Sequence, residues 1–101
     1  MIIVISAANT DVCLSMARII KSSDFYKNVR LIGLTPDSPW PAREYFDDII
    51  TVPLASDPAY GAALADIFAK EKPDIFIPFS EAELSWFVKN PGVAITFPVK
   101  I

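Results

Sequence analysis

The chain has 101 residues, of which 52% are hydrophobic and 21% are charged. This composition favours one folded domain with an apolar core and argues against disorder. The formal charge of −3 and the sequence pI of about 4.7 give no support to a nucleic-acid-binding surface and disfavour binding to anionic membranes.

The rare residue types narrow the chemistry further. The one cysteine, Cys13, rules out an internal disulfide and fits a reducing compartment, and its place on an apolar helical face predicts a core residue. Without histidine, the segment has no His-based catalytic triad and no His metal site. The N-terminal apolar run lacks a basic flank and is too short to span a bilayer, so we expect a cytoplasmic protein without a membrane segment.

The first half of the chain predicts three strands and one long helix. Ile2–Ile5 is a β-branched run without alternation, as in a strand that is covered on both faces. A helix follows, with Asn9 or Thr10 as its N-cap. Further strands are expected at residues 29–34 and 48–53, separated by a proline-rich loop at 35–41 and a helical turn at 42–47.

The second half predicts two helices and two strands. A helix capped by Ser56 or Asp57, with Pro58 at its first position, is expected to end at Pro73. Residues 74–78 predict a fourth strand. Ser80 and Glu83 have the spacing of a capping box for a helix that runs to Lys89, and residues 93–97 predict a fifth strand.

This order of elements predicts a single α/β domain over residues 1–101, a Rossmann-like three-layer sandwich. Right-handed crossovers give a five-stranded parallel sheet in the order 3-2-1-4-5, which reverses direction between the first and fourth strands. Ligands of open α/β sheets bind at that point, so the flanking loops supply the candidate substrate-binding residues: Ser6, Ala7, Ala8, Asn9, Thr10, Ser80, Glu81 and Glu83.

Each loop has more than one interpretation. The first loop could be structural, could bind a small polar substrate through helix N-terminal N–H groups, or could belong to a degenerate NAD(P) or nucleotide-sugar enzyme. Its lack of glycine and the charge of Asp11 argue against the dinucleotide. In the second loop Glu83 is expected to serve as a cap, whereas Glu81 is free to accept a hydrogen bond from a substrate amine or hydroxyl. The sequence predicts no catalytic residue and no metal ligand.

Two aromatic positions suggest an interface. Trp86 and Phe87 are consecutive on the last helix, so both cannot face the core well and we expect one of them at a partly exposed surface. Trp40 stands in the proline-rich loop. Either tryptophan is a candidate contact in a homo-oligomer.

Three segments resemble a known family: REYFDDIITVP, SDPAYGAALADIFAKEKPD and IFIPFSEAEL, at residues 43–53, 56–74 and 75–84. The resemblance covers nearly the whole chain and is to the N-terminal, pre-ATP-grasp domain of carbamoyl-phosphate-synthase-like ATP-grasp ligases. It implies an ATP-grasp domain in cis that binds ATP and Mg²⁺, forms an acyl-phosphate and transfers the acyl group to an amine or ammonia. The present domain would then close the substrate side of the cleft, bind no cofactor and be inactive alone. A stand-alone α/β domain that binds a small ligand or a protein partner is the alternative.

Overall fold

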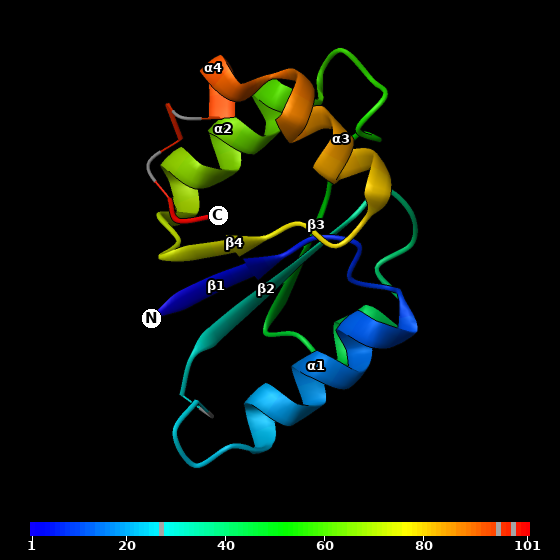
Figure 1. Cartoon of the computed structure of the whole chain (residues 1–101). Coiled ribbons are helices and arrows are strands. Elements are labelled where there is room, and N and C mark those ends of the chain that lie inside the picture. Colours follow the sequence, from blue (N-terminus) through cyan, green and yellow to red (C-terminus); the bar gives the residue numbers. More distant parts are fainter. Residues whose placement is uncertain (27, 95, 98) are drawn as a thin grey trace.

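The computed structural model describes residues 1–26, 28–94, 96–97 and 99–101. At its centre lies a parallel four-stranded sheet in the order β3-β2-β1-β4 (Figure 1). The strands are β1 (Ile2–Ile5), β2 (Arg30–Thr35), β3 (Asp48–Thr51) and β4 (Ile75–Ile77). The predicted order of the first four strands is therefore confirmed.

The helices are divided between the two faces of the sheet. Helix α1 (Asp11–Ser22) and the 3₁₀ turn η1 (Ala42–Glu44) lie on one face, and α2 (Tyr60–Glu71), α3 (Glu81–Lys89) and α4 (Pro91–Ala94) lie on the other (Figure 1). Right-handed crossovers require this division, because the chain moves one way along the sheet from β1 to β3 and the opposite way to β4. No helix within the described ranges is long and apolar enough to cross a bilayer.

Each face of the sheet has its own apolar cluster. The cluster under α1 includes Ile5, Cys13, Ala17 and Leu31, which are all fully buried. The opposite cluster is aromatic and joins α2, α3 and β4 through Tyr60, Phe68, Phe76, Trp86, Phe87 and Phe97. Because α3 contributes Trp86 and Phe87 to this cluster, α3 is part of the core and not a surface appendage.

Trp86 and Phe87 are both half-buried: each packs against the core, and each keeps the partial exposure that we expected of one of them. The Trp86 ring meets Tyr60 on α2 at 5.2 Å, whereas the Phe87 ring meets Phe76 on β4 at 5.8 Å. Helix α3 contacts both α2 and the sheet, and consecutive side chains can therefore each find a buried partner.

The predicted helix starts are confirmed at Thr10 and Ser80. Each hydroxyl accepts a hydrogen bond from the third helical residue: the Cys13 N–H at 3.4 Å and the Glu83 N–H at 3.2 Å. The expected start of the second helix at Pro58 is too early. The Asp57 carboxylate accepts from the Ala59 N–H at 2.8 Å and stabilises a separate turn, so α2 begins only at Tyr60.

The fifth strand that we expected at residues 93–97 is not found among the described residues. Pro91 opens the short helix α4, consistent with the preference of proline for the first helical position, and Ile95 lies outside the described residues. Lys100 instead meets the edge of β4 through a parallel bridge to Ile75, and its carbonyl accepts from the Phe76 N–H at 2.7 Å. The edge position is therefore occupied, but by a single bridge later in the chain.

Candidate functional site

The candidate site lies at the carboxyl ends of β1 and β4, where the order of strands reverses. Ser6 follows β1 directly, and residues 78–80 connect β4 to α3. The Ser6 N–H donates to the Ile77 carbonyl at 3.0 Å, which extends the pairing of the two strands by one residue. The two loops that the sequence predicted to supply the ligand-binding residues are therefore hydrogen-bonded to each other.

The Ser6 side chain connects the two loops a second time. Its hydroxyl donates a hydrogen bond to Glu83 Oε2 and accepts one from the Phe79 N–H at 3.0 Å. Ser6 is fully buried and Glu83 is only 7% exposed. A buried carboxylate requires a hydrogen-bond donor, and Ser6 is positioned by β1 to supply it.

Two further titratable groups surround this carboxylate. Burial, followed by the charge and the proximity of the Glu83 carboxylate, raises the pKa of the Tyr60 hydroxyl, which forms no hydrogen bond of standard geometry with any residue that the structure describes. Burial also raises the pKa of the Cys13 thiol, with the Glu83 charge adding to that effect and a hydrogen bond with Thr10 opposing it. The Cys13 thiol contacts the Ser6 carbonyl at 3.5 Å. A neutral thiol is a poor nucleophile, so Cys13 is a core residue, as the sequence predicted.

Asn9 fixes the first loop against the proline-rich segment. Its Nδ2 donates to the Ser38 carbonyl at 2.6 Å, and its Oδ1 accepts from the Ala42 N–H at 2.8 Å. Both ends of the amide are thus used within the protein. Asn9 therefore joins the first loop to the proline-rich segment and η1. A ligand could bind the Asn9 amide only by displacing one of these hydrogen bonds.

Ala7 and Ala8 shape the backbone of the first loop. Ala7 has φ of 52°, in the left-handed region that favours glycine. Ala8 is fully buried, and a Cβ atom at Gly33 on β2 would lie 2.8 Å from the Cβ of Ala8. The loop therefore sits directly on β2, and this close approach depends on the missing side chain at Gly33.

The remaining candidates form the rim of the site. Thr10 and Glu81 are exposed and Ser80 is half-buried. The capping box that we predicted is only half formed: Ser80 caps the Glu83 N–H, but the Glu83 carboxylate binds Ser6 and not the Ser80 backbone. Glu81 stands at the first position of α3, where the helix dipole favours an anion.

The structure brings together Ser6 and Glu83 out of the eight predicted residues, and it adds Tyr60. The Tyr60 ring packs in the aromatic cluster, and its hydroxyl lies close enough to the Glu83 carboxylate for that charge to raise its pKa. The run of four apolar residues before Ser6 was the available signal that its hydroxyl would be buried. Glu83 gave no comparable signal, because a capping role accounted for it completely.

This arrangement can hold the two loops in a fixed geometry and present helix N-terminal N–H groups and the Glu81 carboxylate at the rim. Within the described residues, no group of three or more Cys, Asp and Glu side chains is placed to hold a metal ion. No protein-family model matches the chain, and a search of curated proteins finds no match.

Proposed function

We propose that this chain is the substrate-side N-terminal domain of an ATP-dependent carboxylate–amine or carboxylate–ammonia ligase of the ATP-grasp class, with a Rossmann-like fold. The observation that carries the proposal is the joined pair of loops at the β1/β4 reversal, with a capped helix starting from each loop. Ligands of open parallel sheets bind at such a reversal. The resemblance of residues 43–84 to pre-ATP-grasp domains supports the same assignment.

The exposed rim of the candidate site suits a small polar substrate. Glu81 is exposed at the start of α3 and is free to accept hydrogen bonds from an amine or ammonium group. Glu83, two residues later, is committed to Ser6 and holds the rim in place. In this proposal Glu81 contacts the acceptor substrate and the Ser6–Glu83 pair positions it.

The chemistry of the ligase lies in a second domain. The sequence has no histidine and no glycine-rich phosphate loop. ATP and Mg²⁺ would bind to the ATP-grasp domain in cis, which supplies the acyl-phosphate. The present domain closes the substrate side of the cleft and is inactive by itself.

Calorimetric titration with ATP–Mg²⁺ tests the proposal. The 101-residue chain is compared with a longer chain that includes whatever the gene encodes after Ile101. We expect ATP–Mg²⁺ to bind only the longer chain and not the 101-residue chain. In the longer chain, Glu81→Gln should raise the KM for the amine more than it lowers kcat. A gene that ends at Ile101, or turnover of ATP by the 101-residue chain, contradicts the proposal.

A stand-alone interaction domain is the second candidate. The exposed apolar side chains of α1, Val12 at 61% and Ile19 at 70%, favour it, because neighbouring exposed apolar side chains are a feature of interaction surfaces. Binding of a small ligand or a protein by a chain that ends at Ile101 would support this candidate against the ligase.

A further inference from the structure

The outward surface of α1 carries two parallel stripes of different chemistry. Val12 and Ile19 form an apolar stripe, and both are more than half exposed. Asp11 and Arg18 form a charged stripe beside it. The members of each pair are seven residues apart, which brings them within about 20° of the same direction around the helix. Ser15 lies between the two stripes, near the middle of the helix.

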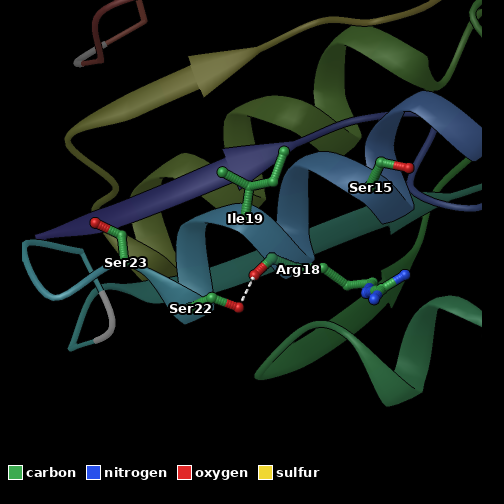
Figure 2. A pocket seen from close by; sticks show the side chains of 5 residues that line it. All are labelled: Ser15, Arg18, Ile19, Ser22 and Ser23. Atoms are coloured by element: carbon green, nitrogen blue, oxygen red, sulfur yellow. Dashed lines mark hydrogen bonds between the residues drawn. The ribbon is translucent and has the colours of Figure 1, made fainter.

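The surface around the Ser15–Ile19 ridge is hollowed on both sides. A shallow depression of about 480 Å³ is lined by Val12, Ser15 and Ile19 together with Asp11 and Met16. A second, of about 550 Å³, is lined by Ser15, Arg18, Ile19, Ser22 and Ser23 (Figure 2). Ser15 and Ile19 belong to both. The helix therefore presents one central ridge with a shallow hollow on each side.

We propose that this face of α1 binds the same face of a second copy of the chain, with the two helices antiparallel across a twofold axis near Ser15. A twofold axis perpendicular to both helices keeps each stripe on its own side of the contact. Val12 of one copy then meets Ile19 of the other, and Asp11 meets Arg18. The small side chain of Ser15 lets the helix axes approach, and the ridges enter the hollows.

The order of charges specifies the antiparallel direction. In a parallel pair the twofold axis runs parallel to the helices. It places the apolar stripe of one copy opposite the charged stripe of the other. Only the antiparallel pair matches apolar with apolar and acid with base. Asp11 and Arg18 form no ion pair with any other residue in the described part of the chain, which leaves both available for this contact. This partner is independent of the proposed ligase function.

Analytical ultracentrifugation over a wide range of concentrations tests the proposal. A contact between two helices is smaller than a standard protein interface, so we expect a reversible monomer–dimer equilibrium with a dissociation constant in the micromolar range or weaker. Ile19→Glu should weaken the dimer by about tenfold or more. Val88→Glu on α3 is the matched control: Val88 is also a highly exposed apolar helix residue, at 79% against 70% for Ile19, and its substitution should leave the equilibrium unchanged.

Charge reversal tests the direction of the helices. Asp11→Arg and Arg18→Asp should each weaken self-association, whereas an equimolar mixture of the two variants should form a heterodimer, because every facing pair is again acid with base. Urea denaturation checks that both variants are folded. A strict monomer at all concentrations overturns the proposal, and so does a dimer that survives Ile19→Glu or a mixture that does not associate.

Discussion

Replacement of Ser6 by alanine should be among the most destabilising small changes in this chain. The substitution removes one hydroxyl and leaves two groups without a partner, the part-buried Phe79 N–H and the buried Glu83 carboxylate. The backbone bond from the Ser6 N–H to Ile77 is retained, so the loss is confined to the side chain. The expected result is a folded but weakened domain.

The magnitude follows from the two orphaned groups. An unpartnered buried N–H costs about 1–3 kcal/mol, and a hydrogen bond to a charged group contributes about 1.5–3 kcal/mol. Partial rehydration through the cavity lowers the sum, so we expect a loss of about 3 kcal/mol. A natural domain of this size has only about 5–15 kcal/mol of unfolding free energy, so the change is severe.

A double-mutant cycle isolates this effect. Urea unfolding is followed by tryptophan fluorescence and by circular dichroism for Ser6→Ala, Glu83→Leu and the double variant. Because the double variant leaves no buried carboxylate without a donor, it should be more stable than the sum of the single losses predicts, by about 2 kcal/mol. Ser80→Ala is the control: it removes a helix cap at a cost of about 1 kcal/mol, and that loss should be equal with Glu83 or Leu at position 83.

Additive losses in the cycle, to within about 0.5 kcal/mol, would refute the reasoning. Such a result would mean that the Ser6 hydroxyl and the Glu83 carboxylate do not depend on each other. Glu83→Gln should lower the unfolding free energy by less than about 1 kcal/mol, because the amide oxygen can still accept a hydrogen bond from Ser6. A larger loss from this variant would also contradict the reasoning.

Three further predictions concern Tyr60, the glycines and Asp47. Tyr60→Phe should leave the unfolding free energy unchanged or raise it by up to about 1 kcal/mol, since the hydroxyl is buried without a described partner. Burial and the Glu83 charge raise the pKa of Tyr60, so the unfolding free energy of the wild type should fall as the pH rises above 10.0, the ordinary tyrosine value. In alkaline denaturation curves Tyr60→Phe should reduce that fall. A loss of more than about 1 kcal/mol in the Tyr60→Phe variant at neutral pH would contradict the prediction. Gly33→Ala should lower the free energy of urea unfolding by about 1–3 kcal/mol, because the added Cβ would lie 2.7 Å from a side-chain carbon of Ile49. Gly92→Ala is the control: its added Cβ meets nothing within 4 Å, so the substitution should be nearly neutral. Equal losses in the two variants would refute the packing argument. Burial raises the pKa of Asp47, but hydrogen bonds from Lys21 and from the Leu31 N–H outweigh burial and lower that pKa below 3.8. The ionised Asp47 therefore stabilises the fold above pH 3.8, and this stabilisation is lost as the pH falls through the lowered pKa. Asp47→Asn should flatten the acid limb of the curve of unfolding free energy against pH.

Local patterns in the sequence were sufficient for most of the fold. The β-branched run of β1 and the N-caps Thr10 and Ser80 have local causes, and the structure has them at the predicted positions. Right-handed crossovers then determined the order of the first four strands. The failures lie where a local signal competed with another. Pro91 favours a helix start, and the chain follows that preference although the apolar residues after it predict a strand.

The candidate site was less accessible to sequence reasoning, because its contacts join residues far apart in the chain. Ser6 and Glu83 are 77 positions apart, and no local pattern predicts that their side chains meet. The location of the site could be predicted, since the reversal of strand order follows from topology alone. The roles within it could not, because Glu83 fits a capping box equally well from its spacing.

The hydrogen bonds within the candidate site limit what a ligand could contact. Ser6 and Glu83 satisfy each other, and both ends of the Asn9 amide are bound within the protein. A substrate that displaced these bonds would have to compensate for each of them, at about 1–3 kcal/mol per group. Recognition at the exposed rim, by Glu81 and by the helix N-termini, has no such cost. We therefore expect substitutions at the rim to alter ligand specificity, whereas substitutions of Ser6 or Glu83 should mainly lower the unfolding free energy.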